Sequence, residues 1–223
     1  ASIETMKRMI DGCHIFVLSG GFSAGDEPDG SGKFIANVLN NRKITDAIHS
    51  LLDRGGLILG ICNGFQALVK SGLLPYGRLG CVGKESPTLF RNDINRHVSQ
   101  IVTTRVATVN SPWLSSFEVG ELHSIAVSHG EGKFVVSDEM AEELFRNGQV
   151  AFQYVDPDGN ATLRAPYNPN GSSFGIEGII SRDGHILGKM GHTERYEDGL
   201  FKNIAGNKVQ EIFANAVNYF KGK

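Results

Sequence analysis

The chain has 223 residues, a formal net charge of −2 at pH 7 and 40% hydrophobic residues. This length is enough to bury one α/β core, and we expect a single domain. The basic residues are scattered, so the charge pattern indicates no nucleic-acid or membrane partner, and we expect small-molecule substrates. No apolar run approaches the about 18 residues of a membrane helix, and no signal pattern opens the chain, so we expect a soluble, cytoplasmic protein.

Helices and short apolar strands alternate in the first half of the sequence. Apolar positions three and four residues apart indicate helices, and short continuous apolar runs that end at glycines indicate buried strands. The expected helices are 3–11, 34–39, 44–52 and 65–69, and the expected strands are 13–18 and 57–61. Such alternation predicts an α/β fold with a mostly parallel sheet and helices on both faces.

The second half contains short β-type runs separated by turn dipeptides such as Asp158-Gly159 and Asp183-Gly184. The expected strands are 98–109, 124–127, 133–137, 149–155 and 174–180, and the expected helices are 140–146 and 208–220. We expect these strands to be antiparallel, either added to the parallel sheet or forming a small side sheet. The sequence shows no internal repeat and no interdomain linker.

The cysteines point to chemistry at one position. Cys13, Cys62 and Cys81 lack the number and spacing of a disulfide framework or a zinc site, so we expect no metal here. Cys62 lies in GICNG (60–64), a cysteine counterpart of the nucleophile elbow between strand and helix. The glycines permit a sharp turn, and the helix N-terminus is expected to favour the thiolate. By itself the pentapeptide is equally compatible with a buried packing cysteine.

A histidine and a carboxylate near the end of the chain complete the pattern. His192 and Glu194 follow the apolar stretch 186–190, and in an extended segment residues two apart face the same side. His192 could then serve Cys62 as a general base while Glu194 orients the imidazole. A His-x-Glu pair is common by chance, but together with the elbow it favours a catalytic triad of Cys62, His192 and Glu194.

Several motifs together resemble those of the class I, triad-type glutamine amidotransferases. The segments that carry the resemblance are 19–34 (SGGFSAGDEPDGSGKF), 56–75 (GLILGICNGFQALVKSGLLP), 91–99 (RNDINRHVS), 127–134 (VSHGEGKF) and 186–198 (ILGKMGHTERYED). Within that family the chain is similar to the glutaminase domains of phosphoribosylformylglycinamidine synthases. The run 164–179 (RAPYNPNGSSFGIEGI) resembles their long single-chain form.

This resemblance implies a flavodoxin-like, three-layer fold of the class I glutamine amidotransferase type. Members of the family begin with a βα unit that has no counterpart before Ile3. We therefore expect the domain 1–223 to be a fragment of a larger synthase. A missing strand would leave a sheet edge uncovered.

The resemblance also implies roles for residues around the triad. The backbone N–H groups of Gly21 and Asn63 correspond to the oxyanion hole, which such chemistry needs because charge develops on the amide oxygen. Gln66 lies one helical turn beyond Cys62 and corresponds to a contact for bound glutamine, with a solvated helix glutamine as the alternative. His129 and Glu131 correspond to substrate-site residues, and polar loop residues are an equal alternative.

Other polar residues have weaker support. His97, His123 and His185 are interpreted as structural or surface groups. The residues Arg91, Asn92 and Arg96 belong to a motif typical of the family, and partner docking, packing and catalysis remain open for them.

The implied reaction begins with attack of the Cys62 thiolate on the side-chain amide of glutamine. His192 protonates the departing ammonia, and water hydrolyses the γ-glutamyl thioester. The resemblance implies that ammonia passes to a synthetase domain of the same polypeptide or complex, which uses ATP and Mg²⁺ to convert formylglycinamide ribonucleotide to formylglycinamidine ribonucleotide in purine biosynthesis. The sequence has no GxxxxGK(S/T) phosphate loop, so we expect no cofactor in this domain.

Two other interpretations keep part of this pattern. The elbow also occurs in other cysteine hydrolases of the same architecture, although these place their histidine differently. A non-catalytic docking or regulatory domain with a vestigial triad is the second alternative. The His192-x-Glu194 pair near the chain end favours the amidotransferase over the first alternative, and labelling by a glutamine-analogue electrophile separates it from the second.

Overall fold

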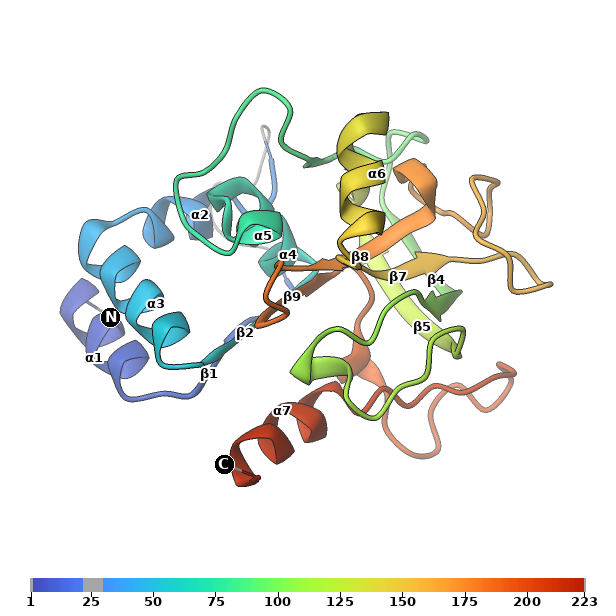
Figure 1. The fold of residues 1–223 in the computed structure, drawn as a ribbon. Coiled ribbons are helices and arrows are strands. Elements are labelled where there is room, and N and C mark those ends of the chain that lie inside the picture. The colour runs from blue at the N-terminus through green and yellow to red at the C-terminus, as the bar shows by residue number, and fades with distance from the viewer. Residues whose placement is uncertain (1, 22–29, 223) are drawn as a thin grey trace.

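The computed structural model describes residues 2–21 and 30–222, in which helices surround a central seven-stranded sheet (Figure 1). Residues 22–29 of the family-like segment 19–34 lie outside the described residues. The helices are α1 (Ile3–Asp11), α2 (Lys33–Leu39), α3 (Arg42–Asp53), α4 (Asn63–Ser71), α5 (Leu73–Tyr76), α6 (Asp138–Arg146) and α7 (Ile212–Lys221). The strands are β1 (Ile15–Leu18), β2 (Leu57–Ile61), β3 (Thr88–Phe90), β4 (Val98–Val106), β5 (Leu122–His129), β6 (Lys133–Val135), β7 (Val150–Tyr154), β8 (Ile176–Ile180) and β9 (Ile186–Lys189).

The large sheet has the strand order β1-β2-β9-β8-β7-β4-β5, and β3 pairs with β6 in a small second sheet. The pairs β1–β2 and β2–β9 are parallel, whereas the other four pairs of the large sheet are antiparallel. The predicted α/β class, with antiparallel strands added in the second half, is confirmed. The antiparallel part is larger than the expected mostly parallel sheet, because short turns such as Asp183-Gly184 join neighbouring strands and such turns connect only antiparallel ones.

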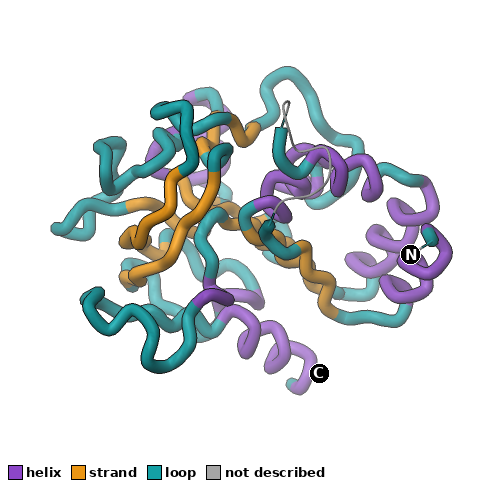
Figure 2. Tube along the Cα trace, turned by 180° about the vertical axis from the view of Figure 1, so that it is seen from behind, coloured by secondary structure: helices purple, strands orange, loops and turns teal. Residues whose placement is uncertain are grey.

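The central strands are covered on both faces, and their sequences reflect this. All residues of β2 and β9 are buried, as expected for parallel strands that lie between layers of helices. Helix α4 contacts both strands, and α5 contacts β9 and its neighbour β8. Helix α7 lies on the other side of the strands, where it packs against the 3₁₀ turn Pro112–Leu114 (Figures 1 and 2).

Local sequence signals explain most element boundaries. The Ser2 side chain accepts a hydrogen bond from the Thr5 N–H and caps α1, and the Ser137 side chain caps α6 in the same way. Helix α7 begins at Ile212 and not at 208 as predicted, because Lys208–Gln210 lie in a loop in which the Asn207 side chain accepts from the Val209 N–H. The short elements α5 and β3 were not predicted.

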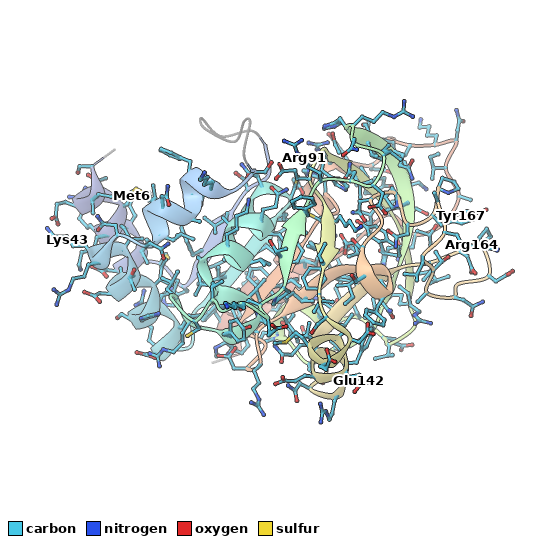
Figure 3. The ribbon with its side chains drawn as sticks, turned by 90° about the horizontal axis from the view of Figure 1, so that it is seen from above. Met6, Lys43, Arg91, Glu142, Arg164 and Tyr167 are labelled. Carbon is cyan, nitrogen blue, oxygen red and sulfur yellow. The ribbon has the colours of Figure 1, made fainter. Side chains whose placement is uncertain are left out.

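Two ends of the molecule are built differently. In Figure 3, Met6 and Lys43 mark the end at which α1 packs against α3, and Arg164 and Tyr167 mark the loop end beyond the antiparallel strands. The three parallel strands lie between these ends. Because parallel strands end at the same edge of a sheet, the residues that follow β1, β2 and β9 are brought together there. These residues include Gly20, Cys62 and His192. Within the described residues, no helix has the length and apolarity needed to cross a membrane.

Candidate active site

Cys62 occupies the sharp turn between β2 and α4. Its backbone has φ 53° and ψ −107°, a conformation that is strained for a residue other than glycine and that aims the side chain away from the strand. A Cβ at Gly64 would lie 1.9 Å from the Leu18 carbonyl oxygen, and one at Gly60 would lie 2.7 Å from the Gly64 carbonyl carbon. Glycine is therefore required on both sides of Cys62, and the predicted strand–turn–helix elbow is present.

His192 and Glu194 lie beyond the end of β9, in direct contact. The Nδ1 of His192 lies 2.5 Å from Glu194 Oε1. Because a carboxylate only accepts, Nδ1 donates to Glu194, and in the neutral imidazole Nε2 is then the nitrogen without a proton. Nε2 is buried and has no hydrogen-bond partner among the described residues. The segment is not extended as predicted: Thr193–Arg195 forms a 3₁₀ turn, and it is this turn that folds the carboxylate back onto the imidazole.

Cys62 and His192 meet across the backbone of Gly20. A Cβ built on Gly20 would lie 2.7 Å from His192 Cε1 and 3.2 Å from Cys62 Cβ, so both side chains rest on the same glycine. The Cys62 thiol lies 3.7 Å from the Ser128 carbonyl oxygen, to which it donates. The thiol and the free imidazole nitrogen are thus neighbours without being hydrogen-bonded to each other, a looser arrangement that is common before substrate binds.

The contact at Gly20 leads to a matched pair of predictions. Gly20→Ala is expected to push the imidazole away from the thiol and to lower the rate of thioester formation by about 10²-fold, the effect of misplacing a catalytic group by about 1 Å. Gly83→Ala is the control, because a Cβ there would meet nothing within 4 Å. Stopped-flow measurement of both variants tests this, and an unchanged rate in Gly20→Ala would contradict the described contact.

Burial governs the protonation of the Cys62 thiol. Desolvation raises its pKa to about 11, although hydrogen bonding from the Asn63 N–H, the Arg195 charge and the Gly21 N–H act in the opposite direction. The expected preference for the thiolate is therefore wrong, because burial outweighs the helix N-terminus. A thiol with this pKa needs a base to become a nucleophile, and His192 Nε2 is the nearby nitrogen without a proton.

The Gly21 and Asn63 amides, predicted as the oxyanion hole, both act on the Cys62 sulfur. Gly21 has φ +113°, a conformation that favours glycine. Two converging N–H donors beside the nucleophile are the arrangement that stabilises a tetrahedral intermediate.

Most of the predicted site residues surround one small cavity of about 50 Å³. It is lined by Gly21, Ser31, Cys62, Asn63, Gln66, Ser128, His129, Gly130, Glu131 and Arg195. The structure thus brings together six of the eight predicted residues at the cavity wall and places the other two, His192 and Glu194, directly behind Cys62 and Gly20. Four further lining residues, Ser31, Ser128, Gly130 and Arg195, were not predicted: they lie in the family-like segments 19–34, 127–134 and 186–198, but no residue type or spacing marks them individually as site residues.

Gln66 and Glu131 close the cavity on one side. The Gln66 amide nitrogen donates to the Glu131 carbonyl oxygen, and the Glu131 carboxylate accepts from the Ser31 N–H at 2.9 Å. The Gln66 side chain is buried, and its Oε1 has no hydrogen-bond partner in the part of the chain that the structure describes. A buried acceptor without a partner costs free energy, so Oε1 is suited to receive a donor from a ligand.

His129 is held as a neutral side chain by its surroundings. Its Nδ1 lies 3.2 Å from Asn92 Oδ1, while the Asn92 amide nitrogen donates to the His129 and Arg96 carbonyl oxygens. Nδ1 therefore carries the proton, and the buried Nε2 has no hydrogen-bond partner within residues 2–21 and 30–222. Burial, together with His97 and His192, lowers the pKa of His129 to about 4.

The role of Asn92, in the family-like segment 91–99, follows from the same bonds. Asn92 is buried, and its Oδ1 also accepts from the Gly132 N–H at 3.1 Å. Asn92 thus fixes the loop that carries His129 and Glu131, which is a packing role among the three that the sequence left open. His97, His123 and His185 do not line the cavity. Within the described residues, no group of three His, Cys, Asp or Glu side chains could hold a metal ion.

The neutral state of His129 predicts a loss of stability in acid. An unfolded histidine takes up a proton below about pH 6.5, whereas the folded one resists until about pH 4, so stability falls as pH decreases through this window. The expected loss is up to about 3 kcal/mol at the acid end. Urea unfolding at several pH values measures it. His129→Gln should show a shallower dependence, and an identical slope in the variant would assign the loss to other groups.

Comparisons with known proteins agree with this geometry. The family model described as a CobB/CobQ-like glutamine amidotransferase domain matches residues 1–220. The phosphoribosylformylglycinamidine synthase subunit PurQ of Gloeobacter violaceus is 36% identical over 202 residues, which cover 91% of this chain and 79% of that protein. PurQ of Chlorobaculum tepidum is also 36% identical, over 92% of this chain and 81% of that protein. The structure of PurLQS from Thermotoga maritima superposes with a TM-score of 0.67 at 29% identity, covering 93% of this chain and 80% of that chain.

Proposed function

Because the chain belongs to the CobB/CobQ-like glutamine amidotransferase family, we propose that it hydrolyses glutamine to glutamate and ammonia at Cys62. The observation that carries the proposal is the convergence of four groups on one glycine-lined turn. The thiol of Cys62, the unprotonated Nε2 of His192 and the N–H groups of Gly21 and Asn63 all lie at the end of the parallel strands.

The reaction proceeds in two halves. His192 Nε2 takes the thiol proton, and the sulfur attacks the side-chain amide carbon of glutamine while Gly21 and Asn63 donate to the oxygen that becomes charged. The protonated imidazole then gives its proton to the leaving nitrogen, which departs as ammonia and leaves a γ-glutamyl thioester. Water, deprotonated by the same imidazole, attacks the thioester carbon, releases glutamate and returns the proton to the sulfur.

Glu194 supports both halves through the imidazole. Burial raises the pKa of its carboxyl, but the hydrogen bond from His192 and other nearby groups outweigh burial, so that the pKa is lowered overall. Glu194 is therefore ionised at neutral pH, and its charge stabilises the imidazolium that forms after proton transfer. Its contact with Nδ1 also fixes the orientation of the imidazole ring.

The groups at the cavity wall suggest how glutamine is held. Gln66 Oε1, a buried acceptor without a partner, suits the α-ammonium group, and the Arg195 guanidinium suits the α-carboxylate. The cavity of about 50 Å³ has room for only a few water molecules, so binding of glutamine requires the cavity wall to open, and the contact between the Gln66 amide and the Glu131 carbonyl oxygen lies in that wall. His129 and Glu131 then border the substrate.

The ammonia has a chemical destination outside this domain. The similar relatives are named as a subunit of phosphoribosylformylglycinamidine synthase, and the similar structure is titled PurLQS. We assign the ammonia to a synthetase partner, in the same polypeptide or complex, that converts formylglycinamide ribonucleotide to formylglycinamidine ribonucleotide in purine biosynthesis. ATP and Mg²⁺ belong to that partner, since this domain needs neither for hydrolysis of an amide.

Glutamate release by the full-length chain, with and without the synthetase partner and its nucleotide substrate, tests the proposal. Glutamate should form in the presence of the partner, in step with formylglycinamidine ribonucleotide. Absence of glutamate under both conditions would overturn it. Release of amino acids from a peptide substrate at a comparable rate would instead favour a cysteine peptidase of the same architecture.

A further inference from the structure

A buried ion pair lies next to residues 191–193, which include His192, but outside the active-site cavity. Lys189 on β9 and Glu177 on β8 each have side chains with 0% exposure, and Lys189 Nζ lies 3.8 Å from Glu177 Oε1. The Phe152 ring lies beside the ammonium, 5.2 Å from Nζ to the ring centroid. Neither charged residue lines the active-site cavity. Buried charges cost free energy unless they are well paired, so their contacts indicate what they hold in place.

The pair holds Gly191, the residue directly before His192, from both sides. Glu177 Oε1 accepts a hydrogen bond from the Gly191 N–H, and Lys189 Nζ donates to the Gly191 carbonyl oxygen at 3.1 Å. A Cβ on Gly191 would lie 2.8 Å from Glu177 Oε1 and 3.1 Å from Lys189 Nζ. Glycine at this position is therefore what allows both charged groups to reach the backbone.

The same ammonium also reaches the residue after His192. Lys189 Nζ lies 3.2 Å from Thr193 Oγ1 and donates to Gln210 Oε1 at 2.9 Å. The Thr193 hydroxyl donates to the same Gln210 oxygen at 2.8 Å. Between these two anchored residues, the His192 N–H donates to the Ala126 carbonyl oxygen at 2.8 Å. Residues 191, 192 and 193 are thus all held: Lys189 contacts the first and the third, and the Ala126 carbonyl oxygen accepts from the second.

We propose that Glu177 and Lys189 are positioning residues that fix the backbone on both sides of His192 and so keep its imidazole against Cys62. The inference rests on the proposed function, in which His192 is the base. Only a cation with three donors can satisfy the acceptors that spread around Nζ, and an apolar side chain of equal volume would leave them without a donor. The burial that lowers the pKa of Lys189 is opposed by Glu177 and Glu194, which favour its charged form.

The double variant Lys189→Met/Glu177→Gln tests the proposal in the full-length protein with its synthetase partner. Removing both charges together avoids an unpaired buried charge, and similar side-chain volumes are retained. We expect kcat for glutamine hydrolysis to fall by at least about 10-fold, as for other changes to groups that orient a catalytic side chain, with KM for glutamine within about twofold of wild type. Lys7→Met/Asp11→Asn is the matched control, because it removes an exposed ion pair on α1 and should leave both constants unchanged.

Amide hydrogen exchange gives a readout that does not depend on activity. Peptides covering residues 190–195 should exchange at least about 10-fold faster in the double variant, while peptides from α3 and β2 keep wild-type protection. If kcat and the exchange of residues 190–195 both equal the wild-type values, the positioning role is wrong. If the wild-type complex itself hydrolyses no glutamine, the proposed function fails while the exchange result still decides whether the pair holds this backbone.

A second variant covers failure of the double variant to fold. Thr193→Val removes only the hydroxyl that lies between Lys189 and Gln210, and we expect a loss of kcat of about 3- to 10-fold without a change in KM. Thr193→Ser keeps the hydroxyl and should restore kcat. Equal kcat in Thr193→Val and the wild type would overturn the proposal independently of the double variant.

Discussion

Cys62→Ala is expected to abolish glutamine-dependent synthesis of formylglycinamidine ribonucleotide by the protein together with its synthetase partner, while synthesis from added ammonium salt continues. The variant removes the sulfur that forms the thioester, and no other described cysteine lies at the cavity. Ammonia supplied from solution bypasses this step. Product formation is measured with each nitrogen source on the same preparation. The rate with glutamine should be lost, and the rate with ammonium salt should persist.

Cys81→Ala is the matched control for this experiment. Cys81 is a free and exposed thiol outside the cavity, so its loss should change neither activity. Loss of glutamine-dependent synthesis in Cys81→Ala, or survival of that synthesis in Cys62→Ala, would show that Cys62 is not the nucleophile. Loss of ammonia-dependent synthesis in Cys62→Ala would point to disrupted contact with the partner and not to chemistry.

Glu194→Gln is expected to lower kcat for glutamine hydrolysis by about 10³- to 10⁴-fold, the range seen when a triad carboxylate becomes an amide. The amide can donate to Nδ1, and this favours the tautomer in which Nε2 carries the proton and cannot serve as a base. KM should change little, because Glu194 does not line the cavity. Steady-state kinetics of glutamate release measure both constants.

Glu197→Gln provides the comparison for Glu194→Gln. Glu197 is an exposed carboxylate three residues along the same loop, and it should be replaceable without loss of activity. An effect of less than about 10-fold for Glu194→Gln would show that His192 is oriented by other groups, among which the backbone contacts of residues 191–193 are the strongest candidates.

Features that depend on neighbouring residues could be predicted from the sequence. The elbow at Cys62 needs only a strand, a helix and, at their junction, two glycines that lie within five residues of each other. All of these features belong to one continuous segment of the sequence. The helix Ile3–Asp11 and the strand Leu57–Ile61 match their predicted ranges for the same reason. The class of fold followed from the order of such elements.

Features that depend on distant segments could not be predicted. The small sheet pairs β3 with β6, which are separated by more than forty residues, and three residues of β3 give too little pattern to identify a strand. The contact of Asn92 with His129 likewise joins positions 37 residues apart. The high pKa of Cys62 reflects burial by several elements, whereas the helix N-terminus that favoured a thiolate was visible locally.

The ion pair of Glu177 and Lys189 also depends on distant segments, but the sequence contains a partial signal for it. Each residue stands in an otherwise apolar strand, IEGII and ILGK, so the sequence marks both as exceptions to the buried pattern. The sequence does not reveal that the two strands are neighbours, or that both side chains contact the backbone of Gly191. A charge within a fully apolar strand is thus a signal for a paired internal site, although its partner emerges only from the fold.

Covalent labelling with a glutamine-analogue electrophile tests most directly whether Cys62 is the nucleophile of a glutamine site. The full-length protein with its synthetase partner should take up one label per chain, located at Cys62 by peptide mass spectrometry and prevented by excess glutamine. No labelling of Cys62 in the complex, or labelling that glutamine does not slow, would contradict the assignment of Cys62 as this nucleophile.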